Sequence, residues 1–255
     1  MSANQETFKS CYRGRQGALY HLSYMRTAKV KAAYYVLEKA GLILENKRVF
    51  DYGFGAGTFF RHLPKSASIA GVEMDEENAI AVREMVEKRG LDGSGIQAID
   101  ISKWQDHPLL DEKYDLVVCS HVLEHVPEPE PLVRRLLACL NRSGRLLVLV
   151  PINERVVNEH HVHQFHSQAL AGLLENCNGV VERIAETDYF FDRLQPLYAK
   201  DASGLKRIIQ QVLALGIGVL AALFSAEKWH ELGVLTGKLF GFKPTQLAAV
   251  VSRRE

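Results

Sequence analysis

Short apolar runs that are typical of buried strands alternate along this chain with longer segments of helical periodicity. The short runs predict strands at residues 49–50, 67–74, 95–99, 114–120, 144–150, 179–186 and 246–252. The longer segments predict helices at 22–40, 76–89, 132–140, 168–176 and 205–224. Alternation of strand and helix over five strands favours an α/β fold, in which a doubly wound parallel sheet carries helices on both faces.

Local signals predict where several of these helices begin and end. Gly41 follows the first helix and suits the left-handed position after a helix C-terminus. Three prolines between residues 127 and 131 interrupt the helical pattern, so the next helix is predicted to begin at residue 132. Ser167 is expected to cap the helix at 168–176. Residues 1–21 lack a clean period and are interpreted either as an arm that folds over a ligand or as a frayed terminus.

The bulk composition limits the class of protein. A chain of 255 residues with 47% apolar content can form one well-buried core with an insertion. A net charge of +1 gives no general attraction for nucleic acid or an anionic membrane surface, although local patches stay open, and no nucleic-acid partner is expected. The four cysteines are far apart and form no C-x-x-C pair, which argues against a disulfide frame. Together with a polar N-terminus that lacks a signal-peptide core, they predict a cytoplasmic protein.

The segment RVFDYGFGAGTFF, residues 48–60, predicts a ligand-binding turn between a strand and a helix. The strand is followed by Asp51 and then by Gly53, Gly55 and Gly57, whose missing Cβ lets the backbone lie against a ligand. A dinucleotide fingerprint would need a small residue where Thr58 stands. Asp51 would also repel a pyrophosphate, whereas it suits an ammonium group. The pattern therefore favours a ligand with a cationic amino-acid end over an ordinary glycine-rich loop.

A second acid follows the second predicted strand. Glu73 lies 22 residues after Asp51, and a carboxylate at about 20 residues beyond such a turn accepts hydrogen bonds from both ribose hydroxyls in nucleoside-binding folds. The acids at 75–77 are interpreted instead as a solvated helix start. A nucleoside that carries an amino acid would satisfy both predictions.

Two motifs resemble the class I S-adenosylmethionine-dependent methyltransferases. VFDYGFGAG at 49–57 matches the first motif of that family, and LEHV at 123–126 resembles the loop of its small-molecule members. The resemblance implies S-adenosyl-L-methionine as cofactor and a seven-stranded, mostly parallel sheet with an antiparallel last strand. It further implies that Asp100 accepts from the adenine amino group, that the Ile101 N–H faces the adenine ring, and that Ser120 contacts the cofactor.

Histidines in and after the LEHV loop are the candidate catalytic residues. If the acceptor is a hydroxyl, its proton must be removed, and His125 is the first candidate, followed by His121, because imidazole titrates near neutral pH. A purely structural role for His125 stays open. His121, Glu124 and His125 could also share one face of a helical turn and hold a metal with a later histidine, which loosely resembles small-RNA 2′-O-methyltransferases. The sequence pattern alone assigns no metal ligand.

The segment at 203–241 departs from a minimal domain, so we divide the chain into an arm and helix (1–44), a cofactor-binding domain (45–202), a helical insertion (203–241) and the final strand (242–255). Three interpretations of the apolar helix at 205–224 stay open: a cover for the core, a homodimer face and peripheral contact with a membrane.

The sequence predicts O-methylation of a small molecule, such as a sugar, a natural product, or a quinone-like or lipid-linked compound. The alternatives are a metal-assisted RNA 2′-O-methyltransferase, a non-catalytic scaffold that binds S-adenosylmethionine, and a nicotinamide dehydrogenase.

Overall fold

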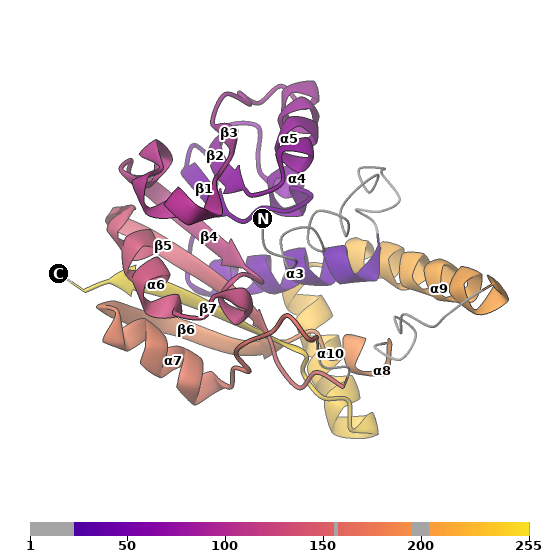
Figure 1. The fold of residues 1–255 in the computed structure, drawn as a ribbon. Coiled ribbons are helices and arrows are strands. Elements are labelled where there is room, and N and C mark those ends of the chain that lie inside the picture. The colour runs from indigo at the N-terminus through magenta and orange to yellow at the C-terminus, as the bar shows by residue number, and fades with distance from the viewer. Residues whose placement is uncertain (1–22, 156–157, 195–203, 255) are drawn as a thin grey trace.

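The computed structural model describes residues 23–155, 158–194 and 204–254, so the predicted arm at 1–21 lies outside the described residues (Figure 1). The described strands form one sheet in the order β3-β2-β1-β4-β5-β7-β6. They are β1 (Arg48–Tyr52), β2 (Ser68–Glu73), β3 (Ile96–Ala98), β4 (Tyr114–Ser120), β5 (Leu140–Pro151), β6 (Gly179–Thr187) and β7 (Gln246–Arg253). Strands β1 to β5 pair in parallel, and β7 runs antiparallel to both β5 and β6. The predicted mostly parallel sheet with an antiparallel last strand is confirmed.

Helices cover both faces of this sheet because alternate residues of each central strand point to opposite sides. Val49 belongs to the core shared with α3 (Tyr24–Lys39), α4 (Thr58–His62) and α5 (Glu76–Lys88). Phe50 belongs to the core shared with α6 (Pro129–Ala138) and α7 (Ser167–Asn176). The near-continuous apolar runs of the strands are therefore buried on both faces.

Two predicted helix starts are wrong. Helix α6 begins at Pro129, three residues before the predicted start, because proline is tolerated in a first turn, where its missing N–H needs no partner. Helix α7 begins at Ser167 itself, and its N-cap is His166, whose Nδ1 accepts from the Ala169 N–H at 3.2 Å. Helix α6 also ends at Ala138 rather than at the predicted residue 140, and strand β5 begins earlier than predicted, at Leu140. The central part of every predicted element lies where the pattern placed it.

The glycine turn after β1 has the geometry that its sequence predicts. Gly53, Gly55 and Gly57 have φ values of 73°, 54° and 68°, in the left-handed region that favours glycine. A Cβ on Gly53 would lie 2.7 Å from Cγ2 of Val122, which follows β4. The turn can therefore lie close to the loop after β4 only because the residue is glycine.

The insertion between β6 and β7 contains α8 (Phe191–Leu194), α9 (Gly204–Leu223) and α10 (Ala226–Phe240). It is attached to the domain through a separate apolar cluster in which Ala214, Ala221 and Trp229 contact Tyr24 and Ala28 of α3. In Figure 1, α9 extends away from the sheet. Among the described residues, no helix combines the length and the hydropathy needed to cross a membrane.

Candidate functional site

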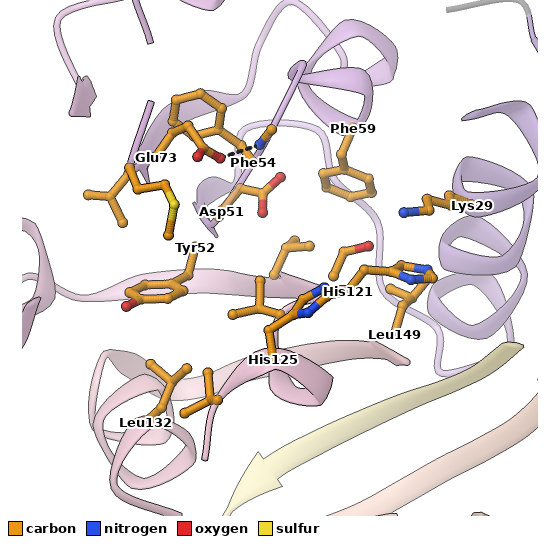
Figure 2. Close-up of a pocket in the computed structure, with 18 of the residues that line it drawn as sticks. Lys29, Asp51, Tyr52, Phe54, Phe59, Glu73, His121, His125, Leu132 and Leu149 are labelled. Carbon is orange, nitrogen blue, oxygen red and sulfur yellow. Dashed lines mark hydrogen bonds between the residues drawn. The ribbon is translucent and has the colours of Figure 1, made fainter. Parts of the chain in front are cut away.

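A cavity of about 540 Å³ lies at the carboxyl ends of the central strands, within the range of about 300–1,000 Å³ that is typical of small-molecule sites. The end of β1 contributes Asp51, the end of β2 contributes Glu73, and the loop after β4 contributes His121 and His125. These side chains gather here because the carboxyl ends of parallel strands meet at the same edge of a sheet. Figure 2 shows Asp51, Lys29, His121 and His125 pointing into this space.

Glu73 connects the second strand to the glycine turn. Its side chain is buried, and its Oε2 accepts from the backbone N–H of Gly55 at 2.7 Å, the contact drawn as a dashed line in Figure 2. Its Oε1 accepts more weakly, from the Asp75 N–H at 3.3 Å. Burial raises the pKa of Glu73 although these backbone N–H groups oppose the shift. The carboxylate is thus held in a fixed orientation at the cavity wall.

Asp51 is a buried carboxyl group at the cavity wall. It is 3% exposed, and within the described part of the chain its Oδ1 has no hydrogen-bond partner. Burial raises its pKa to about 8; the neighbouring Glu73 adds to the shift, and Lys29 opposes it. A buried carboxyl oxygen without a partner is costly, and a cationic ligand group would remove that cost. The position therefore fits the predicted ammonium group.

Two cations of α3 line the cavity, and the sequence reasoning did not identify them. Arg26 and Lys29 share one face of α3 with Val30 and Ala33, at the i, i+3, i+4 and i+7 spacing. Burial and the nearby Arg26 lower the pKa of Lys29 to about 7, although surrounding acids, including Asp51, raise it. The sequence does contain a signal that could have identified them, since two basic residues stand on a helix face whose other residues, Val30 and Ala33, are apolar. Lys29 offers a positive charge to an anionic ligand group opposite Asp51.

His125 is oriented by the segment that follows β5. Its Nδ1 lies 3.0 Å from the carbonyl oxygen of His160; since a carbonyl only accepts, Nδ1 carries the proton and Nε2 has the lone pair. Its ring also packs edge-on against that of His161, with 4.7 Å between the ring centroids. Burial lowers the pKa of His125, and the opposing effect of Glu124 is smaller. The imidazole is therefore neutral at pH 7, the state in which it can accept a proton.

His121 is held more tightly than His125. Its Nε2 lies 2.9 Å from Oε1 of Gln246, the first residue of β7, and its Nδ1 lies 3.4 Å from Oε1 of Glu124. Its φ of 56° is in the left-handed region, which a non-glycine residue adopts only when its surroundings enforce it. Burial, followed by repulsion from Lys29, lowers the pKa of His121. Both predicted catalytic histidines therefore reach the cavity, with His125 less constrained than His121.

Three side chains could hold a divalent cation. Glu124, His125 and His161 each offer a ligand atom, and these atoms all lie within 4.8 Å of one another. Glu124 is fully buried; burial would raise its pKa, but the contacts with His121 and His125 outweigh burial and lower it. The sequence hypothesis placed His121 on the same helical turn as these ligands. The turn contains only Leu123–His125, so His121 lies outside it and outside the cluster.

The other residues that the sequence predicts for the cofactor site lie partly in the cavity and partly outside it. Gly53, Gly55 and Ser120 line the cavity, while Gly57 does not and packs against Val82. Asp100 is exposed and does not line the cavity, because its Oδ1 caps the 3-10 helix Ile101–Asp106 by accepting from the Ser102 N–H at 3.0 Å. The side chain of Ile101 is outside the described part of the structure. Ile99 and Trp104, on either side of it, line the cavity. The adenine contacts of Asp100 and Ile101 stay predictions.

Comparison with known proteins gives three kinds of match. Residues 24–184, more than half of the chain, match the family described as "Methyltransferase domain". Ubiquinone biosynthesis O-methyltransferases of Yersinia pestis (strain Pestoides F) and Yersinia pseudotuberculosis serotype O:1b (strain IP 31758) are 30% identical over 113 residues, which cover 44% of this chain and 45% of each relative. The match thus spans less than half the length of these curated relatives.

Solved structures share the fold at low sequence identity. Coclaurine N-methyltransferase bound to N-methylheliamine and SAH matches with a TM-score of 0.59 and 15% identity, over 98% of this chain and 85% of that one. The cyclase SpnF matches with a TM-score of 0.56 and 14% identity, over 88% of this chain and 80% of that one. Since the second is named for a cyclisation, the shared fold alone does not specify the reaction.

Proposed function

We propose a specific reaction for this chain, which belongs to the family of proteins with a methyltransferase domain: transfer of a methyl group from S-adenosylmethionine to a hydroxyl oxygen of a small molecule. S-adenosylmethionine is the cofactor of this family and supplies a methyl group bound to a positively charged sulfur. The observation that carries the proposal is one cavity that contains the Asp51 and Glu73 carboxyl groups together with His125, whose pKa is lowered by burial.

The residues at the carboxyl ends of β1 and β2 fit this cofactor. The Oδ1 atom of Asp51, which has no hydrogen-bond partner within the described residues, would hold the ammonium group. Glu73, fixed by the Gly55 N–H, would accept from the ribose hydroxyls with its remaining lone pairs. Gly53 has no Cβ, so Val122 packs against it and both residues line the cavity beside the ligand. Lys29 would pair with the carboxylate of the amino-acid end.

His125 would activate the acceptor. The Nε2 atom would take the hydroxyl proton while the oxygen bonds to the methyl carbon and the bond from that carbon to the donor sulfur breaks. The alcohol would become an ether, the donor would leave as the neutral thioether S-adenosylhomocysteine, and the imidazole would become an imidazolium. The His160 carbonyl, which accepts from Nδ1–H, fixes the ring and stabilises the positive charge that develops on it. Most of the rate would come from holding the reacting atoms in line, and the cavity walls supply that positioning.

The walls of the cavity favour an apolar acceptor with a hydroxyl group. Val30 and Ala33 of α3, Phe59 of α4 and Val162 after β5 form apolar parts of the lining, whereas Glu159 and His160 add polar edges. We therefore propose a phenolic or quinone-like acceptor and assign the chain to the small-molecule subgroup with the L-E-H-V loop. The similarity to ubiquinone biosynthesis O-methyltransferases supports this class of acceptor.

Methyl transfer with a labelled donor tests the proposal. The chain is incubated with S-adenosylmethionine that carries a tritiated methyl group and with catechols, hydroxybenzoates, a sugar, a primary amine and a short RNA, while S-adenosylhomocysteine binding is measured in parallel. We expect label on the oxygen of a phenolic acceptor. Label on the amine or the RNA would refute the proposed acceptor class. Binding of S-adenosylhomocysteine without transfer to any acceptor would favour the scaffold alternative.

A further inference from the structure

The outer face of α9 is apolar along its whole length. Ile208 and Val212 are 57% and 63% exposed, and Leu223 is 78% exposed. At 3.6 residues per turn, the large aliphatic residues of α9 that are exposed occupy one arc of about 140°: Leu205, Ile208, Ile209, Val212, Leu213, Val219, Leu220 and Leu223. The sequence has no charged residue between positions 208 and 223. Patches of this kind on a protein surface mark a site of interaction.

The inner face of α9 buries three small residues and the polar Gln210, with Ile217 partly buried beside them. Ala214 and Ala221 are buried and belong to the apolar cluster with Tyr24 and Ala28 of α3, and Gly218 is buried on the same side. An amphipathic helix of a globular protein has the opposite distribution, with its large apolar residues turned inward. Small residues at a helix contact and aliphatic residues facing outward are instead the distribution found where the outer surroundings are lipid.

The charge of the insertion distinguishes a lipid surface from a second copy of the chain. Residues 204–243, the part of the insertion that contains α9 and α10, have five basic and two acidic residues, while the whole stretch between β6 and β7 (188–245) has seven and five. Lys228, Lys238 and Lys243 are exposed, and Lys238 lies beside the exposed Leu239 and Phe240 at the end of α10. In a twofold dimer the two basic insertions would lie near each other and repel, whereas anionic lipid headgroups attract them.

We propose that the outer face of α9 lies on an anionic membrane surface, with its aliphatic side chains among the acyl chains and the lysines of the insertion at the headgroups. Because α3 holds the inner side of α9, only one side of the helix faces lipid. The same α3 lines the cavity with Arg26 and Lys29, so one helix separates the lipid-facing helix from the site. Delivery of a lipid-linked acceptor to the cavity would follow only if the proposed function holds; membrane binding does not depend on it.

Co-sedimentation with vesicles tests this proposal without measuring methyl transfer. The full chain is mixed with vesicles of phosphatidylcholine alone or with one quarter phosphatidylglycerol. We expect the chain to pellet with the anionic vesicles, and the double variant Val212→Glu, Leu220→Glu to reduce the bound fraction at least fivefold. Both side chains are exposed, so the fold should persist, which thermal unfolding checks. The matched control is Ile43→Glu, Ile80→Glu, which changes two exposed apolar residues elsewhere and should bind like the wild type.

Three outcomes would overturn the proposal. The first is a wild-type chain that stays in solution with vesicles of either composition. The second is equal binding by the α9 variant and the wild type. The third is a wild-type dimer, measured by light scattering, that the α9 variant converts to a monomer, since this would identify a second copy of the chain as the occupant of the face.

Discussion

The buried carboxyl group of Asp51 predicts that donor affinity depends on pH. Its pKa is raised to about 8, so the free protein holds this group mostly protonated at neutral pH. A donor with an ammonium group prefers the carboxylate, so binding requires a proton to leave. Raising the pH ionises Asp51 in the free protein, and the affinity should therefore increase with pH. Asp51→Asn removes both the charge and its titration while it preserves the shape of the side chain.

The expected size follows from the two pKa values. With a pKa of about 8, Asp51 is roughly 1% ionised at pH 6 and roughly 10% ionised at pH 7. If only Asp51 matters, affinity therefore rises roughly tenfold over this interval, or about 1.4 kcal/mol. Lys29, with a pKa of about 7, loses part of its charge over the same interval. If the donor carboxylate also needs that charge, the rise is reduced to roughly fivefold.

Isothermal titration with S-adenosylhomocysteine at pH 6 and pH 7 measures this effect. The heat should also vary with the ionisation enthalpy of the buffer, because protons are released on binding: nearly one per ligand if only Asp51 matters, and about 0.4 at pH 7 if Lys29 must also be charged. In Lys29→Met the affinity is expected to fall, while its dependence on pH becomes steeper, toward tenfold. Asp115→Asn serves as a control, because Asp115 lies outside the cavity and accepts from the Arg48 N–H. The reasoning is refuted if the wild type binds equally at both pH values, or if Asp51→Asn keeps the dependence on pH.

Three further predictions concern the base, the turn and metal dependence. His125→Gln should lower turnover by about a hundredfold and leave S-adenosylhomocysteine affinity unchanged. The control is His163→Gln, which should retain activity, because the Nε2 of His163 contacts the Pro127 carbonyl. Equal turnover of the two variants in single-turnover assays would show that His125 is not the base. Gly53→Ala should weaken ligand binding and lower the stability of the fold more than Gly41→Ala does. Both glycines have φ near 70°, but only a Cβ at position 53 would meet another side chain. Equal urea unfolding curves for the two variants would contradict this. Dialysis against EDTA should leave transfer unchanged, and loss restored by Mg²⁺ or Zn²⁺ would assign the glutamate and histidine cluster as a metal site instead.

The sequence predicted those site residues whose position depends on local backbone structure. Asp51 and Glu73 lie in the last two residues of paired parallel strands, so knowing the strands was sufficient to place both carboxyl groups at one edge of the sheet. The glycine turn was predictable for the same reason, because its left-handed backbone is a property of consecutive residues. The predictions that failed at the starts of α6 and α7 concern helix ends, where proline, serine and histidine can each occupy more than one position.

Other parts of the site depend on contacts between segments that are distant in the sequence. Lys29 lies opposite Asp51 only because α3 packs over the sheet. Burial there lowers the pKa of Lys29, and Lys29 in turn opposes the rise in the pKa of Asp51 that burial and Glu73 cause. His161 joins Glu124 and His125 because the segment after β5 folds back over the loop after β4. Hydrophobic periodicity indicated an apolar helix at 205–224, but which face it buries was decided by the small residues that fit against α3. Spacing along a chain determines which residues share a face of one element, whereas the faces that meet are decided by the packing of all elements together.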